Sequence, residues 1–109
     1  MPNVAIVILL LSGVAMADDD LLDIPSDAQA TYTVVQKAGT KKNPTLTTKR
    51  VDSNGESYSK RIFDCEKQIT KYLGDGETLK EMKESMPEKK MYAVVVASIA
   101  WYQYKYVCK

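Results

Sequence analysis

Polar and apolar residues alternate through the middle of this chain, and β-branched and aromatic side chains are frequent among them. Alternation with a period of two is the pattern of a half-buried β-strand. The strands that it predicts are residues 31–37, 45–52, 56–65 and 67–73.

The segments between these strands contain residues typical of turns. Asn54-Gly55 separates the second strand from the third and favours the positive φ angles of a tight β-hairpin. We expect a bend near Glu66 and loops at residues 38–44 and 74–76, where glycine and proline interrupt the pattern. An antiparallel sheet follows from these short connections.

The last third of the chain changes pattern. Residues 77–86 carry apolar residues every three or four positions, Thr78 and Glu81 have the spacing of a capping box, and Pro87 follows. A short helix near 78–86 is therefore expected. Residues 89–97 form an apolar run rich in valine and are predicted to be a buried strand.

The tail at residues 98–108 fits two interpretations. Alternation would give a strand with a tyrosine face, which the propensity of aromatic residues slightly favours. A helix would instead use Ser98 as its N-cap and place tyrosines on one face at a spacing of three to four.

The first seventeen residues resemble a secretory signal peptide. An apolar run of about fourteen residues, too short to span a bilayer, ends in Ala15-Met16-Ala17 and is followed by acidic residues. We expect cleavage between Ala17 and Asp18, with no lipid anchor because position 18 is not cysteine. Residues 18–30 are predicted to be an acidic segment, flexible or paired to a sheet edge, and residues 31–109 a single α+β domain.

Export decides how the two cysteines are interpreted. In an oxidising compartment, two cysteines of a small domain usually pair, and we expect a disulfide between Cys65 and Cys108. Two buried thiols are the alternative. A catalytic cysteine has no base to activate it, because the chain contains no histidine.

Charge is unevenly distributed along the chain. Residues 1–30 hold five acidic and no basic side chains, whereas residues 31–109 hold all 15 basic side chains against nine acidic ones. This excess is too small to indicate nucleic-acid binding. It does suggest a basic sheet face, with Lys37 beside the candidate binding residues Lys41, Lys42, Lys49, Arg50, Lys60 and Arg61. A merely solvated strand face is the alternative.

Aromatic side chains near the C-terminus form a second candidate surface. Tyrosine and tryptophan are enriched in binding patches, but they also fill the contact between a sheet and a helix. The residues concerned are Tyr92, Trp101, Tyr102, Tyr104 and Tyr106.

Motifs of known catalytic or cofactor sites are absent from the sequence. The chain has no glycine-rich phosphate loop, nucleophile elbow or paired-cysteine metal motif. We therefore expect neither an enzyme nor a cofactor.

Two segments, SYSKRIFDCEKQITKYLGDG and VVASIAWYQYKYVCK, resemble the bacterial surface-adhesin protein E family. The resemblance implies a twisted antiparallel sheet of about five strands, and a C-terminal helix starting near Ser98 that Cys65 and Cys108 tie to the sheet. The chain departs from the family by lacking a tryptophan in its first strand, a Pro-Gly before Ser98, and a lipid-attachment cysteine.

The resemblance also implies a function. It suggests a binding protein, in the periplasm or at the cell surface, whose partner is an extracellular or periplasmic protein or an acidic glycan. The alternative is a periplasmic inhibitor or immunity-type protein that inserts the loop 39–44 or 74–76 into a partner enzyme.

Overall fold

Six antiparallel strands follow one another across one sheet in the order of the sequence. The computed structural model describes residues 20–109, so the predicted signal peptide and its cleavage between Ala17 and Asp18 lie outside the described residues. The strands are β1 (Leu21–Leu22), β2 (Thr31–Gly39), β3 (Pro44–Asp52), β4 (Gly55–Asp64), β5 (Ile69–Gly76) and β6 (Tyr92–Ala93).

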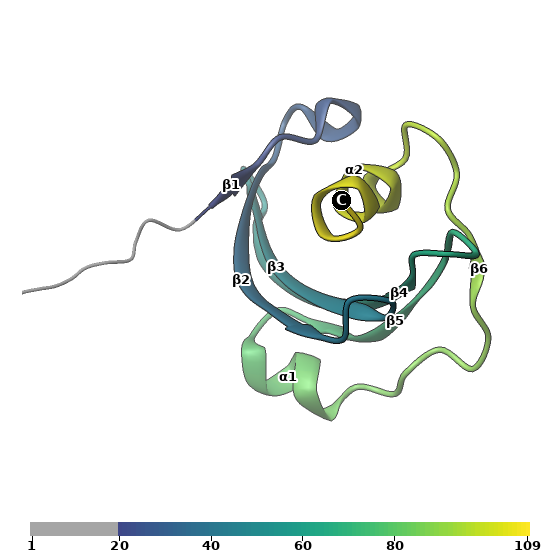
Figure 1. Ribbon diagram of the computed structural model, residues 1–109. Helices are drawn as coiled ribbons and strands as arrows, with labels where there is room; N and C mark the ends of the chain where they lie inside the picture. Colours follow the sequence, from purple (N-terminus) through teal and green to yellow (C-terminus); the bar gives the residue numbers. More distant parts are fainter. Residues whose placement is uncertain (1–19) are drawn as a thin grey trace, which may run out of the picture.

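Two α-helices lie on opposite faces of this sheet. The sheet curves around α2 (Ile99–Val107), which occupies the hollow side, while α1 (Leu79–Glu84) packs on the outside of the curve (Figure 1). We call these the inner face and the outer face. The expected α+β class is confirmed, with one short helix and a C-terminal helix that a disulfide ties to the sheet.

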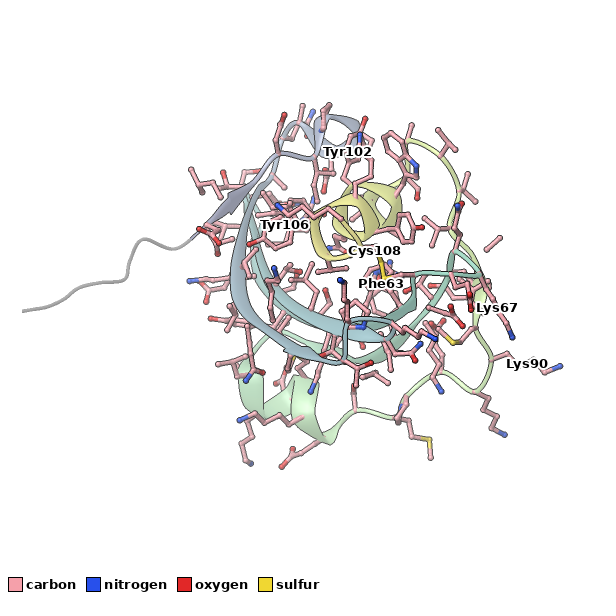
Figure 2. All side chains as sticks on the ribbon, viewed as in Figure 1. Phe63, Lys67, Lys90, Tyr102, Tyr106 and Cys108 are labelled. Carbon is pink, nitrogen blue, oxygen red and sulfur yellow. A yellow bond between two sulfur atoms is a disulfide. The ribbon has the colours of Figure 1, made fainter. Side chains whose placement is uncertain are left out.

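The core lies between the inner face and α2. Leu46 and Phe63 are buried there, and Figure 2 shows Phe63 between the sheet and α2. The ring of Phe63 lies 6.3 Å from that of Tyr104 on α2. Thr70 is also buried, and its hydroxyl donates to the carbonyl of Ile62 on the neighbouring strand. The inner face therefore carries the side chains that the alternation of β3, β4 and β5 points toward the helix.

The β3–β4 hairpin confirms the predicted position of the turn. Asp52 pairs with Gly55, so the turn consists of Ser53 and Asn54. Gly55 has a φ of 131°, and the Asn54 amide donates to the side chain of Asp52. Of the Asn-Gly pair, only the glycine has a positive φ.

The predicted loop at residues 74–76 is wrong. β5 begins at Ile69 and runs through Gly76, and residues 74–76 pair with β4. A Cβ atom on Gly74 would lie 2.2 Å from the carbonyl oxygen of Met82 in α1. Glycine is required here because the helix backbone approaches the strand closely, and not because the chain turns.

The predicted buried strand at residues 89–97 is also wrong. Only Tyr92 and Ala93 pair with β5, and Val95 and Val96 are 65% and 71% exposed. β6 is the edge strand of the sheet, so among residues 20–109 no further strand pairs with it beyond β5. The chain then turns, with Ala97 at a φ of 70°, to bring α2 over the inner face.

Both helices begin at the residues that their caps predict. Thr78 accepts from the Glu81 amide at the start of α1, and Ser98 accepts from the Trp101 amide at the start of α2. These are the N-cap bonds that stabilise the first turn of a helix. The helical interpretation of the tail is therefore confirmed, while Met86 lies beyond the end of α1.

The acidic N-terminal segment pairs with the sheet edge. β1 pairs with Tyr32 and Thr33 of β2, and Ile24 is buried. A short 3-10 helix, Pro25–Asp27, follows and brings Asp27 to the sheet. The segment was expected to be either flexible or paired to a sheet edge. In residues 20–30 it is paired to the edge.

Candidate functional site

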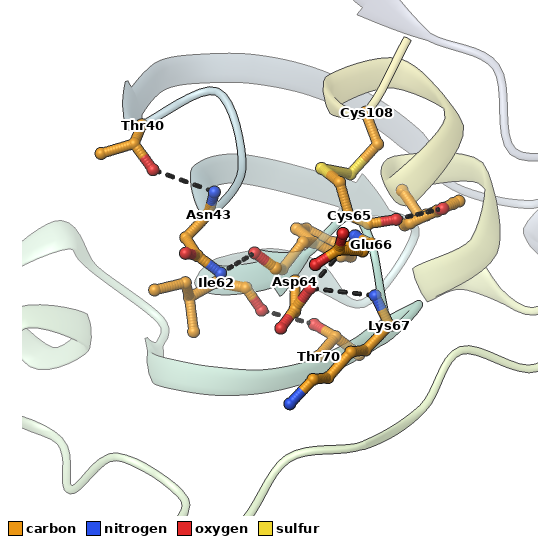
Figure 3. The surroundings of a disulfide bond; sticks show 11 residues. Thr40, Asn43, Ile62, Asp64, Cys65, Glu66, Lys67, Thr70 and Cys108 are labelled. Atoms are coloured by element: carbon orange, nitrogen blue, oxygen red, sulfur yellow. Dashed lines mark hydrogen bonds between the residues drawn. A yellow bond between two sulfur atoms is a disulfide. The ribbon is translucent and has the colours of Figure 1, made fainter.

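The disulfide joins Cys65, just after β4, to Cys108 at the end of α2, with a Cα–Cα distance of 5.5 Å. Figure 3 shows how the surrounding chain supports it. The Tyr104 hydroxyl donates to the carbonyl of Cys65, and the Cys65 amide donates to the carbonyl of Lys42. These contacts hold three segments together around the sulfur atoms, which gives both cysteines a structural role.

The predicted basic residues do not share one face. Lys49 and Lys60 point outward, since Lys60 lies opposite Thr47 and Lys49 follows two positions later on β3. Arg50 and Arg61 belong to the inner face, and Lys37 also does, with its ammonium group 5.0 Å from the ring centre of Tyr106. The remaining residues, Lys41 and Lys42, lie in the β2–β3 loop beside the disulfide.

Arg50 is fully engaged within the molecule. Its Nε donates to Asp27 at 2.7 Å and its Nη1 to Asp52 at 2.6 Å. Tyr32 donates to the same Asp27 carboxylate at 2.7 Å. This network joins the N-terminal segment to β2 and β3, so it holds the fold together and leaves Arg50 little capacity for a ligand.

The network shifts the pKa values of its members. The hydrogen bonds from Arg50, followed by that from Tyr32, lower the pKa of Asp27. The hydrogen bonds from Arg50 and from the Asn54 amide lower the pKa of Asp52. Burial, and then its hydrogen bond to Asp27, raise the pKa of Tyr32 to about 12.

Arg61 is buried without an ion-pair partner among the described residues. Its guanidinium carbon lies 3.9 Å from the ring centre of Tyr72, and its Nη1 donates to the Tyr92 hydroxyl at 3.0 Å. Its Nε has no partner in the part of the chain described. Stacking on an aromatic ring replaces part of the hydration that the buried guanidinium has lost. Arg61 is therefore a packing residue that joins Tyr72 of β5 to Tyr92 of β6.

Three partly exposed lysines, one each from β3, β4 and β5, lie on the outer face. Lys71 lies opposite Ile62, two positions from Lys60, so both lysines share the face with Lys49. Among the ion pairs of the described residues, one involves this group, between Lys49 and Glu56 at 3.6 Å. This lysine group, which we call the outer basic face, replaces the mixed set predicted from the sequence.

A cavity of about 410 Å³ opens on this outer face, between the sheet and α1. We call it the α1 pocket, and its apolar walls are Val35, Leu73, Leu79 and Met82. Lys60 of β4 and Lys83 of α1 complete it, together with Gln36, Thr47 and Gly74. No acidic residue among those described lines it.

A second cavity, of about 360 Å³, lies between the inner face and the start of α2. Arg50, Asp75 and Glu77 line it, so its charged groups are of both signs. Gln103 lines it as well, and is 2% exposed with an Oε1 that has no hydrogen-bond partner among residues 20–109. The arginine that lines this cavity is already paired with the carboxylates of Asp27 and Asp52.

The aromatic residues of the tail divide between core and surface. Tyr104 packs on Phe63, and Tyr106 donates to Asp20 at 2.7 Å. Trp101 and Tyr102 contact each other edge to face at 5.0 Å and are partly exposed, with the Lys105 ammonium 4.0 Å from the Trp101 ring centre. They therefore form no continuous aromatic patch.

Metal and membrane sites were also considered for residues 20–109. Within these residues, no group of three or more histidine, cysteine, aspartate or glutamate side chains is placed to hold a metal ion. Neither helix of this part is long and apolar enough to cross a bilayer.

No protein-family model matches this chain, and no curated protein or solved structure is significantly similar to it. The resemblance to the surface-adhesin protein E family therefore stays a prediction.

Sequence reasoning missed Lys71, Lys83 and the α1 pocket. The register of β5 and the docking of α1 place these residues, and neither follows from alternation alone. The closely spaced Gly74 and Gly76 were the available signal, because both lie against α1, where a Cβ atom would collide with the helix.

Proposed function

We propose that this chain is an exported, non-enzymatic binding protein that holds an acidic macromolecule, a glycan or a protein segment, against its outer basic face. The observation that carries the proposal is the grouping of Lys49, Lys60 and Lys71, all partly exposed, on one side of the sheet, where Glu56 pairs with Lys49. Such a surface attracts and orients anionic partners.

Export is supported by the leader-like first seventeen residues and by the Cys65–Cys108 bond. Disulfides persist mainly in oxidising compartments. The inhibitor alternative loses one of its two candidate loops, because Gly74–Gly76 lies within β5 beneath α1.

The proposal is tested by retention of the disulfide-bonded protein on immobilised dextran sulfate and on immobilised polyglutamate. We expect retention at low salt that is lost by about 0.5 M salt, where the screening length falls to a few ångströms. Replacing Lys60 and Lys71 together by glutamate should abolish retention, because it reverses the charge at the centre of the outer basic face.

A matched control reverses two exposed lysines outside that face, Lys67 and Lys90 (Figure 2). The control has the same net charge as the test variant, so it should still be retained if position matters. Equal loss in both variants, or retention that persists at high salt, would show that the outer basic face is not the binding surface.

A further inference from the structure

Two β-bulges open into the α1 pocket. In β2 the register shifts between Val34 and Gln36, so Val35 has no partner on β3. In β5 Leu73 has no partner on β4, because Lys60 pairs with Gly74 and Arg61 with Tyr72. Both unpaired residues line the α1 pocket. Bulges redirect side chains and are frequent beside functional sites, so their convergence here is a specific feature of the fold.

The walls of the α1 pocket are aliphatic and reach the surface. Val35 is 44% exposed and Leu79 is 37% exposed, while Met82 is buried at the base of α1. Exposed aliphatic side chains around a cavity of about 410 Å³ lose contact with water when an apolar group enters. The volume is within the usual range of small-molecule sites, which is about 300–1,000 Å³.

The charged groups of the pocket have a single sign. Lys60 comes from the sheet and Lys83 from α1, so the two ammonium groups belong to different elements. Neither lysine takes part in the ion pairs found among residues 20–109. An anionic group at the mouth of the pocket would supply the missing counter-charge.

A pocket with aliphatic walls and unpaired cations is complementary to a ligand that is apolar at one end and anionic at the other. We propose that the α1 pocket binds a fatty carboxylate, with its tail against Val35, Leu73 and Leu79 and its carboxylate near Lys60 and Lys83. A polyanion lacks the apolar tail, and a neutral lipid leaves both ammonium groups unpaired. The inference rests on the proposed function only in that Lys60 belongs to both sites.

The test is calorimetric titration of the disulfide-bonded protein with dodecanoate below its micelle concentration. We expect saturable binding of one equivalent. Lys60→Gln and Lys83→Gln should each weaken it about tenfold, as expected for loss of a hydrogen bond to a charged group. Leu79→Gln should weaken it by a similar factor, because it places an amide on the apolar wall. Dodecanol should bind more weakly than dodecanoate, and equally to the wild type and to Lys60→Gln.

Lys80→Gln is the matched control, since Lys80 lies on the same helix but pairs with Glu84 and does not line the pocket. It should leave dodecanoate affinity unchanged. Absence of saturable binding would overturn the proposal, as would equal affinities in the wild type, Lys60→Gln and Leu79→Gln. Leu79→Gln should keep its retention on dextran sulfate, so failure of the fatty-carboxylate site is distinguishable from failure of the outer basic face.

Discussion

The two arginines of this sheet make different contacts. Arg50 is paired with two carboxylates, whereas Arg61 stacks on Tyr72 and donates to Tyr92. Both were candidates for ligand binding by their charge alone. Their contacts make them structural residues: two carboxylates hold the partly exposed Arg50, and the tyrosine contacts of buried Arg61 replace water that it has lost.

The Arg50 network predicts how stability depends on pH. The lowered pKa values of Asp27 and Asp52 contribute stability that is present above their ordinary pKa of 3.8 and is lost as pH falls below it. Outside the network, burial and then its hydrogen bond to Asp20 raise the pKa of Tyr106 to about 12. Tyr32 and Tyr106 therefore both contribute stability that is present below pH 10 and lost between pH 10 and about 12. Urea midpoints measured across pH should therefore fall at both ends.

Tyr32→Phe and Tyr106→Phe isolate the alkaline side of this profile. Each variant removes one ionisation with little change in shape, so the decline between pH 10 and 12 should become shallower. An unchanged decline in both variants would show that these two hydroxyls do not govern alkaline unfolding.

The α1 element depends on glycine in the strand beneath it. Gly74→Ala would place a Cβ atom 2.2 Å from the Met82 carbonyl oxygen, and backbone cannot yield as a side-chain end can. We expect α1 to be displaced and the free energy of unfolding to fall by about 1–3 kcal/mol, the usual cost of overpacking. Hydrogen exchange should accelerate in α1, and the α1 pocket should lose dodecanoate binding.

The sheet offers an internal reference for this measurement. Amides of β3 and β4 away from α1 should accelerate by no more than the fall in the free energy of unfolding allows, whereas amides of the displaced α1 should accelerate further. Unaltered exchange within α1 itself would mean that the helix tolerates the added methyl group.

Sequence patterns correctly predicted the helices and strands that are determined by neighbouring residues in the chain. Alternation located β2, β3 and β4, and cap residues located the starts of α1 and α2. The run at residues 89–97 failed because burial of an apolar segment depends on a covering partner, which the sequence does not display. The α1 pocket could not be predicted, because it needs two bulges and a docked helix at once.

The basic residues also show, within one strand, where prediction from the sequence fails. Lys60 and Arg61 are adjacent in sequence, yet one reaches the outer face and the other the inner face. Grouping cations by sequence distance therefore joined two surfaces that the sheet separates. The disulfide was predictable from two features of the sequence, the leader-like first seventeen residues and the presence of two cysteines.

At the scale of the whole molecule, the disulfide closes a loop with a sequence separation of 43. A loop of this length reduces the entropy of the unfolded chain by an amount worth about 4 kcal/mol. The double variant Cys65→Ser with Cys108→Ser should therefore unfold at a clearly lower urea concentration than the oxidised protein. Two equal midpoints would contradict this account.

The closed loop also contains the exposed chain around Val95 and Val96. A protease that cuts there severs the backbone between the sheet and α2, but both new fragments remain joined through sulfur. Such a nick opens a ring and does not divide the molecule. The C-terminal helix therefore stays attached to the sheet after the very cut that would otherwise release it.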